Sequence, residues 1–285
     1  MIDRFAQLPA DLARRTRRMT LAGVPALVAH PDWARPAPTM LWMHGRTVSK
    51  EIDPGRYLRW VRAGIAAVAL DLPGHGERFD AALQRPERAM DVVNQMAGEI
   101  DGVVDALAAP GLGEFVDFAR TGIGGMSAGG MAALRRLCDG HDFVCGAVEG
   151  TTGWLEGLYF PAGGAGPRGV VMDRAGVMAA DAMSRLGGFR PIPMLFLHAE
   201  GDRIVPLGVT RAFVEALRAR YRESGTNPEL VRLRTWGQTG APDEHAGFGR
   251  FGHEAKNAQL EFLSAYLGGV GGTEPGSPAG EFGGS

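Results

Sequence analysis

Short apolar runs, each long enough for one buried β-strand, recur along the chain. They lie at 39–43, 65–70, 118–123, 143–148, 192–197 and 230–235. Stretches with apolar residues at helical spacing alternate with them, at 54–63, 86–107, 128–137, 207–221 and 254–267. Strands that alternate with helices form a mainly parallel sheet with helices on both faces. The pattern therefore predicts the α/β class, with a doubly wound, mainly parallel sheet.

One segment breaks this alternation. Residues 154–190 are rich in glycine, methionine and aromatic residues and are too long for a plain connection. We interpret them as a small cap inserted into a single domain that covers residues 1–267. Residues 268–285 are rich in glycine, proline and serine without periodicity, which predicts a flexible tail or a remnant of cloning.

The N-terminal part is open to two interpretations. Thr16-Arg17-Arg18-Met19 precedes the apolar stretch 21–29, an order that faintly resembles a twin-arginine export signal. The alternative is a β-hairpin that turns near Gly23-Val24-Pro25. The hairpin is favoured because the apolar stretch is short and interrupted by glycine and proline, and a cytoplasmic location follows. No apolar run approaches the length of about 18 residues that indicates a membrane span.

Charge and cysteine content narrow the expected partners. The formal net charge of −2 provides no broad basic field for nucleic acid, so we expect a small-molecule substrate and neither a nucleic-acid nor a membrane partner. Cys138 and Cys145 predict two buried thiols, since a disulfide framework or a zinc site would need more cysteine or histidine ligands. No metal or organic cofactor is expected.

The segment Gly125-Met126-Ser127-Ala128-Gly129 is the candidate nucleophile turn. The Gly-x-Ser-x-Gly pattern is weak alone, but here it follows a predicted strand and opens a predicted helix, as a nucleophile elbow requires. Such a turn holds the serine in a strained conformation, and side chains at 125 and 129 would collide with it. The context therefore predicts Ser127 as an attacking residue.

A serine hydroxyl needs a base to take its proton, and in this kind of fold the acid and then the histidine follow the serine in the chain. Asp202, just past the run 192–197, is the acid candidate, and Glu200 is a weaker rival. Two histidines compete for the role of base. His245 lies in a loop that contains glycine, whereas His253 adjoins the start of the last predicted helix, so His245 is favoured.

The loop after the run 39–43 supplies the remaining candidates. His44-Gly45-Arg46 resembles an oxyanion-hole turn, in which the backbone N–H of Arg46 would act together with that of Ala128. The large cation of Arg46 suggests a preference for acidic or polar substrates. Trp154 is a candidate for lining an acyl pocket, although aromatic residues there more often pack beneath a cap.

Three other histidines are expected to have no catalytic part. His75 lies in Asp71-Leu72-Pro73-Gly74-His75-Gly76-Glu77, which predicts a rigid turn with a structural histidine. His30 and His141 are expected on the surface.

These residues together resemble the α/β-hydrolases over approximately residues 20–267. The segments MHGRTVSKE (43–51) and LDLPGHGERFD (70–80) look like small bacterial esterases related to prolyl oligopeptidase. The segment EHAGFGRFGHEAKNAQLEFL (244–263) is similar to the catalytic-histidine region of dienelactone hydrolases and their relatives. Dienelactone hydrolases proper use a cysteine nucleophile, so their lactone substrate is not implied here.

The resemblance implies an α/β-hydrolase fold, to which residues 154–190 would add the small cap, and it assigns the roles residue by residue. The nucleophile falls on Ser127, the acid on Asp202, the base on His245, and the oxyanion donors on Arg46 and Ala128. We predict ester hydrolysis through an acyl-enzyme, and the glycine-rich loops and the short cap point to small soluble carboxylic esters. An acyltransferase or a peptidase with the same triad is the alternative, and a non-enzymatic binding module is the remaining one.

Overall fold

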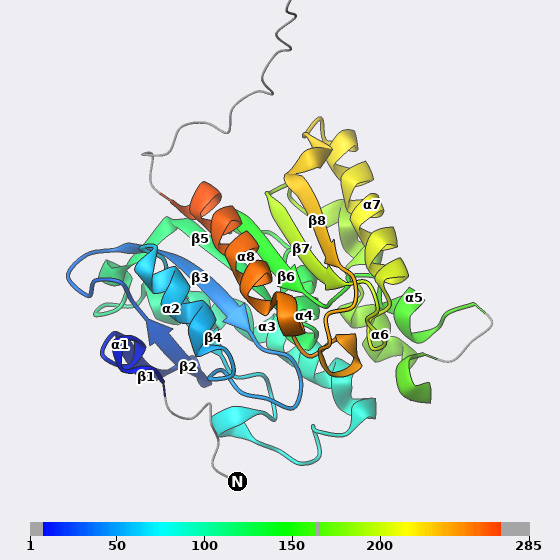
Figure 1. Ribbon diagram of the computed structural model, residues 1–285, viewed down its shortest axis with the longest axis horizontal. Helices are drawn as coiled ribbons and strands as arrows, with labels where there is room; N and C mark the ends of the chain where they lie inside the picture. Colours follow the sequence, from blue (N-terminus) through cyan, green and yellow to red (C-terminus); the bar gives the residue numbers. More distant parts are fainter. Residues whose placement is uncertain (1–7, 163–165, 269–285) are drawn as a thin grey trace, which may run out of the picture.

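The computed structural model describes residues 8–162 and 166–268 of the protein. A single sheet of eight strands runs through it in the order β1-β2-β4-β3-β5-β6-β7-β8 (Figure 1). The strands are β1 (Thr16–Leu21), β2 (Val24–Ala29), β3 (Ala37–Met43), β4 (Ala66–Leu70), β5 (Val116–Met126), β6 (Cys145–Glu149), β7 (Met194–Ala199) and β8 (Val231–Trp236). Strands β3 to β8 are mutually parallel, whereas β1 and β2 pair antiparallel at one edge. The predicted α/β class with a mainly parallel sheet is confirmed.

Five of the strands are buried along their whole length. Every residue of β2, β3, β4, β6 and β7 is buried, as expected for a sheet that is covered on both faces. In the edge strand β8 only the first and last residues are buried, and both of its arginines, Arg232 and Arg234, are exposed. Charged side chains on an edge strand discourage pairing with a second sheet.

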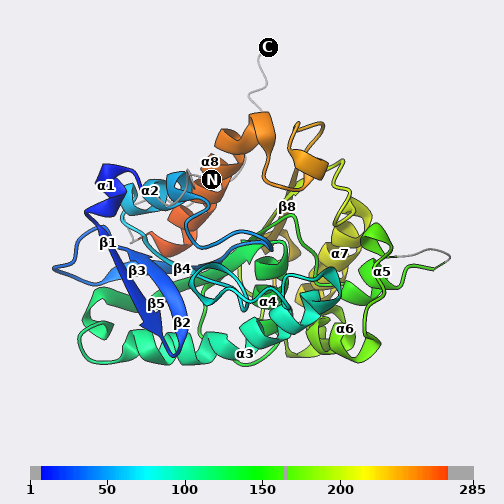
Figure 2. The same cartoon turned by 90° about the horizontal axis from the view of Figure 1, so that it is seen from below.

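Helices form one layer on each face of the sheet. They are α1 (Ala10–Ala13), α2 (Pro54–Arg62), α3 (Ala89–Ala108), α4 (Ala128–Arg136), α5 (Leu155–Tyr159), α6 (Arg174–Ala180), α7 (Leu207–Glu223) and α8 (Gly252–Leu267). Figure 2 shows α1, α2 and α8 on one side of the sheet and α3, α4 and α6 on the other. Two apolar clusters correspond to these layers, one beneath α1, α2 and α8 and the other beneath α3 to α7.

The N-terminal hairpin is present, and its turn lies slightly earlier than predicted. Leu21 pairs with Val24, so Ala22 and Gly23 form a two-residue loop in which both have positive φ, 47° and 84°. This is the geometry of a type I′ turn, whose twist matches that of the strands it joins. Within the described part of the chain, no helix has the length and apolar character needed to cross a membrane.

The segment between β6 and β7 folds into short helices. Helices α5 and α6 are accompanied by the 3₁₀ turns η4 (Pro167–Gly169) and η5 (Met183–Gly188). Asp181 organises them, because its carboxylate accepts hydrogen bonds from the backbone amides of Leu155, Glu156 and Ser184 at 2.6, 3.1 and 2.8 Å. Their apolar side chains join the same cluster as α3 and α4, so the segment shares the main core. Its role as a cap stays a prediction, and all of the predicted tail except Gly268 lies outside the described residues.

The cysteines agree with prediction and one histidine does not. Cys138 and Cys145 are both buried and unpaired, as expected for two structural thiols. The prediction that His30 lies on the surface is wrong, because Trp33 and Phe115 pack against its ring, which is 1% exposed. His30 donates through Nε2 to the carbonyl of Phe115 at 2.9 Å, and burial lowers the pKa of its imidazole.

Candidate active site

Ser127 occupies a sharp turn between β5 and α4. Its backbone has φ 50° and ψ −119°, a conformation that residues other than glycine rarely adopt. Strain of this kind costs on the order of 1–3 kcal/mol and persists only where the surroundings fix it. The surroundings here include the carbonyl of Glu149 in β6, which accepts the Ser127 amide at 2.9 Å.

The glycines around Ser127 are required by close backbone contacts. A Cβ at Gly125 would lie 2.6 Å from the carbonyl oxygen of Met43, and one at Gly129 would lie 2.3 Å from the same oxygen. Both distances are shorter than any real Cβ contact tolerates. The turn therefore fits tightly against the end of β3, which is the steric reason for glycine that the motif predicted.

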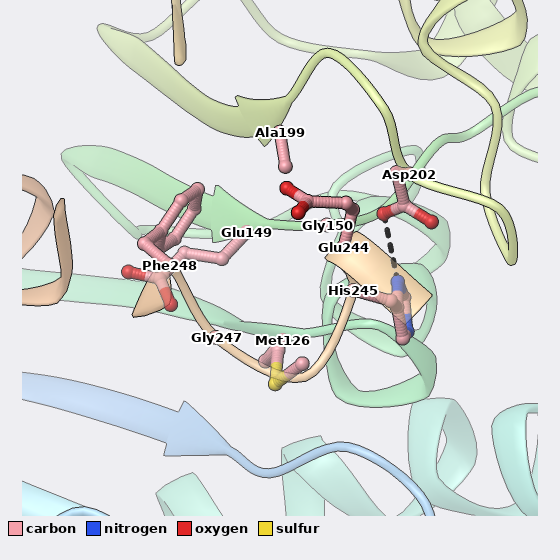
Figure 3. A pocket seen from close by; sticks show the side chains of 9 residues that line it. All are labelled: Met126, Glu149, Gly150, Ala199, Asp202, Glu244, His245, Gly247 and Phe248. Carbon is pink, nitrogen blue, oxygen red and sulfur yellow. Dashed lines mark hydrogen bonds and ion pairs between the residues drawn. The ribbon is translucent and has the colours of Figure 1, made fainter. Parts of the chain in front are cut away.

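Ser127, His245 and Asp202 form one hydrogen-bonded chain. The Ser127 hydroxyl oxygen lies 2.9 Å from Nε2 of His245, and Nδ1 of the same ring lies 2.8 Å from Oδ2 of Asp202. Figure 3 shows the contact between Asp202 and His245 as a dashed line. Because an ionised carboxylate only accepts, Nδ1 carries the proton and Nε2 offers its lone pair to the serine hydroxyl. The three residues come from three different loops at the carboxyl ends of β5, β7 and β8.

The loop after β7 holds Asp202 in place. Oδ1 accepts the amides of Ile204 and Val205, both at 2.8 Å, which leaves Oδ2 to His245. His198, at the end of β7, donates through Nε2 to the carbonyl of Val205 at 2.8 Å. Burial lowers the pKa of His198, which favours its neutral form, and the bond to Val205 steadies this loop.

The loop that carries His245 has two residues in the left-handed region. Asp243 and Glu244 both have φ 52°. The Glu244 carboxylate accepts the amide and hydroxyl of Thr239 at 2.6 and 2.7 Å and the amide of Gly240 at 2.8 Å. These bonds lower the pKa of Glu244 and close the loop on itself. The sequence did not indicate that Glu244 closes this loop, since Glu244 precedes His245 without any recognisable motif.

The acid loop and the histidine loop are joined to each other. The amide of Arg203 donates to the carbonyl of Asp243 at 3.1 Å, and its guanidinium lies 3.1 Å from the Asp243 carboxylate. These two bonds connect the loop that carries Asp202 to the loop that carries His245, and we call them the Arg203–Asp243 joint.

The two rival residues lie apart from this chain. His253 is exposed in the first turn of α8, where its Nδ1 lies 3.2 Å from Nδ2 of Asn257. Glu200 is exposed and accepts the hydroxyl of Thr235 at 2.8 Å. Among the described residues, neither forms a hydrogen bond or ion pair with Ser127 or His245, so the structure brings together the favoured candidates and leaves the rivals outside this chain.

The loop after β3 lies beside the serine. A Cβ built on Gly45 would be 3.5 Å from Cβ of Ser127. The side chain of Arg46, however, turns away to another loop, where its guanidinium donates to the carbonyls of Leu83, Gln84 and Arg85 at 3.2, 2.6 and 3.0 Å. These carbonyls occupy the cation, which counts against the predicted preference for acidic substrates.

Trp154 stands immediately before α5. Its amide donates to the hydroxyl of Thr152 at 3.1 Å, and its ring lies so close to Gly157 that a Cβ there would be 2.4 Å from Cδ2 of the indole. The ring is partly buried against the core under α3 and α4. Packing is therefore its visible role, and contact with an acyl group stays a prediction.

A buried ion pair lies beneath the nucleophile turn. The guanidinium of Arg56 meets the carboxylate of Glu149 through two bonds of 2.6 and 2.8 Å, and the two residues are 5% and 3% exposed. Arg56 also bonds Asp53 at 3.0 Å and Gln259.

A small cavity adjoins this ion pair behind the candidate base and is lined by Met126, Glu149, Gly150, Ala199, Asp202, Glu244, His245, Gly247 and Phe248 (Figure 3). Among the described residues, no group of three or more His, Cys, Asp or Glu side chains is arranged to hold a metal ion.

The strand order and the elbow at Ser127 define a protein of the α/β-hydrolase fold, as the sequence resemblance implied. No model of a protein family matches the chain. Among curated proteins it is 26% identical over 229 residues to "Putative esterase YitV" of Bacillus subtilis (strain 168), covering 75% of this chain and 87% of that one. It is 25% identical over 257 residues to "Esterase YjfP" of Escherichia coli (strain K12), covering 87% and 97%.

Solved structures agree with this fold. TT1662 from Thermus thermophilus superposes with a TM-score of 0.66 at 26% identity, over 89% of this chain and 98% of that one. A cold-adapted esterase from an Arctic intertidal metagenomic library gives 0.61 at 19% identity, over 88% and 93%. A puromycin-hydrolyzing peptidase of Mycobacterium tuberculosis gives 0.67 at 18% identity, over 92% of this chain but 42% of that one. The last two show the fold alone, whereas the curated relatives support an enzyme of the hydrolase class, with ester hydrolysis as the activity at family level.

Proposed function

We propose that the protein is a serine carboxylesterase in which Ser127 is the nucleophile, His245 the general base and Asp202 the orienting acid. The observation that carries the proposal is the unbroken hydrogen-bonded chain from the serine hydroxyl through the imidazole to the buried carboxylate. The strained backbone of Ser127 supports it, because strain at a single polar residue next to such a chain is typical of catalytic sites.

The reaction follows from these positions. Nε2 of His245 takes the hydroxyl proton as Ser127 Oγ forms a bond to the ester carbonyl carbon, and the carbonyl oxygen becomes an oxyanion. The backbone N–H groups of Arg46 and Ala128 stabilise that oxyanion. The imidazolium, held by Asp202, then gives its proton to the leaving alkoxide as the acyl–oxygen bond breaks. Water, deprotonated by the same imidazole, attacks the acyl-enzyme and releases the carboxylic acid and the free serine.

Ester hydrolysis is favoured over the alternatives by the relatives. Both curated proteins are named esterases and match over most of their length, whereas the peptidase neighbour is more than twice as long as the part this chain covers. Small soluble esters, a cytoplasmic location and independence from cofactors belong to this proposal. Acyl transfer to an alcohol is tested with the same enzyme by adding an acceptor alcohol and measuring how the products divide.

The experiment combines active-site labelling with kinetics on p-nitrophenyl esters of increasing chain length. A fluorophosphonate should label the wild-type protein once per chain and should not label Ser127→Ala. His245→Ala should lower kcat by about 10⁴-fold or more, because members of a triad act as a unit. The matched control His253→Ala removes a histidine eight positions away in the same region and should keep wild-type kcat. Unlabelled wild-type protein, or equal loss in both histidine variants, would refute the proposed function.

A further inference from the structure

The peptide bond between Gly45 and Arg46 carries the proposed oxyanion donor, the N–H of Arg46. A hydrogen bond to the carbonyl of Gly45 fixes the orientation of this peptide. In a trans peptide the C=O and the N–H point in opposite directions within one plane. The carbonyl oxygen of Gly45 lies 2.6 Å from Nδ1 of His44. The N–H of Arg46 must therefore point away from the His44 ring. The same stretch of backbone lies against Ser127, since a Cβ on Gly45 would be 3.5 Å from the serine Cβ.

The hydrogen bonds also define the tautomer of His44. A carbonyl oxygen only accepts, so Nδ1 carries the proton in its contact with Gly45. Nε2 then offers a lone pair and accepts the backbone amide of Leu72 at 3.1 Å, while Oδ1 of Asp71 lies further away, at 3.5 Å from the same nitrogen. The residue is 1% exposed, so water does not compete for either bond. The imidazole thus joins the exit of β4 to the peptide after β3.

The far end of the same loop is fixed by a buried ion pair. Asp71 accepts the Lys50 amide at 2.9 Å and the Lys50 ammonium at 2.7 Å. Burial disfavours the charged form of Asp71, yet the neighbouring His44 imidazole, the Lys50 ammonium and the amides of Glu77 and Lys50 outweigh it and hold its pKa well below the usual range. Between the two anchors, Thr47 has φ 67°, a conformation that is costly for a β-branched residue. The loop cannot relax from this shape while both ends are held.

We propose that His44 is a positioning residue for the oxyanion hole. By donating from Nδ1 to the Gly45 carbonyl, it sets the plane of the peptide so that the Arg46 N–H faces the oxygen that becomes negative during attack by Ser127. This inference rests on the proposed function and adds to it a residue that touches neither substrate nor nucleophile.

Two substitutions separate the two ring nitrogens. In His44→Asn the side-chain amide can replace Nδ1 as donor to Gly45, whereas in His44→Gln the amide oxygen can replace Nε2 as acceptor from Leu72. We expect His44→Gln to lower kcat per titrated active site by about tenfold or more with KM within about twofold, because an oxyanion donor is then misaligned. His44→Asn should stay within about threefold of wild type. The affinity for a trifluoromethyl ketone, whose adduct carries an oxyanion, should fall by the same factor as kcat in each variant.

If His44 only supports the fold, both variants should have a lower melting temperature and a smaller fraction of sites titrated by fluorophosphonate. Their kcat per site and ketone affinity should then be unchanged, and this result would overturn the proposal. Nitrogen-15 NMR of wild-type protein supplies a test that needs no variant to fold. A protonated Nδ1 and an unprotonated Nε2 are expected at His44, and the opposite tautomer would also overturn it. If wild-type protein is labelled and active, either negative result affects this inference alone, whereas absence of labelling affects the proposed function.

Discussion

In the variant Glu149→Gln, a neutral amide would replace the carboxylate that faces Arg56 beneath the nucleophile turn. The carboxylate makes two bonds of 2.6 and 2.8 Å to the guanidinium, and both residues are almost fully buried. Removing one partner of such a pair leaves an uncompensated buried charge and typically costs about 3–5 kcal/mol. Asp53 remains 3.0 Å from the guanidinium and offsets part of this loss, so we expect the lower end, about 3 kcal/mol.

The assay is urea denaturation followed by circular dichroism, with the melting temperature as a second readout. A loss of about 3 kcal/mol corresponds to a decrease of about 6–12 °C for a chain of this size. The control is Glu215→Gln, which breaks the pair with Arg218, where the glutamate side chain is 60% exposed. Exposed pairs contribute about 0–1 kcal/mol, so this variant should be close to wild type.

A third variant tests the reasoning from the opposite side. If the cost comes from the charge left alone, then replacing both partners, in Arg56→Met with Glu149→Leu, should recover much of the stability that Glu149→Gln loses. A loss below about 1 kcal/mol in Glu149→Gln, or a double variant less stable than the single one, would refute the account of Arg56 as a buried cation that depends on its partner.

Three further predictions concern pH, packing and chemistry. Burial lowers the pKa of His141 to about 4. The stability that the neutral imidazole contributes is therefore complete above the ordinary pKa of 6.5 and is lost as the pH falls toward 4. The melting temperature of His141→Gln should fall less than that of wild type between pH 7.5 and about 4.5. Gly124→Ala should prevent folding, as judged by circular dichroism, because its Cβ would lie 1.8 Å from the carbonyl of Ala147, whereas Gly98→Ala, an exposed helical position with nothing within 4 Å, should stabilise the protein by about 0.5–1 kcal/mol. Asp202→Asn should reduce ester hydrolysis by about 10⁴-fold while the melting temperature changes little, and a variant with more than a tenth of wild-type kcat would contradict the assigned role.

Features that depend on local pattern could be predicted from the sequence. The apolar runs located six of the eight strands to within a few residues, and Gly23 in a short interrupted stretch indicated the hairpin that accounts for the other two. The Gly-x-Ser-x-Gly pattern between a strand and a helix selected Ser127, the position after a strand selected Asp202, and the glycine-containing loop favoured His245 over His253; the fold brings the three side chains into contact. The strands and the hairpin could be predicted because period and turn chemistry are properties of neighbouring residues, and the catalytic roles of the three side chains stay a prediction.

Features that depend on distant partners could not be predicted. Arg56 and Glu149 are 93 positions apart, and nothing near either one indicates that they meet. The sequence suggests that the Arg46 side chain favours acidic or polar substrates, because the carbonyls that bind it lie 37 to 40 positions further along the chain and cannot be recognised from its neighbours. His30 was placed on the surface for the same reason, since the ring of Phe115 that covers it lies 85 positions away.

The Arg203–Asp243 joint has a consequence for how the enzyme would lose activity. Since a backbone hydrogen bond and an exposed ion pair link the loops of Asp202 and His245, we expect the two loops to move together and to keep the contact between carboxylate and imidazole. The weaker link is the single 2.9 Å contact between His245 and Ser127, because Ser127 belongs to a separate and rigid turn. We therefore expect moderate heating to break the hydrogen bond between Ser127 and His245 first. The contact between His245 and Asp202 should persist, and activity should be lost well before the sheet unfolds.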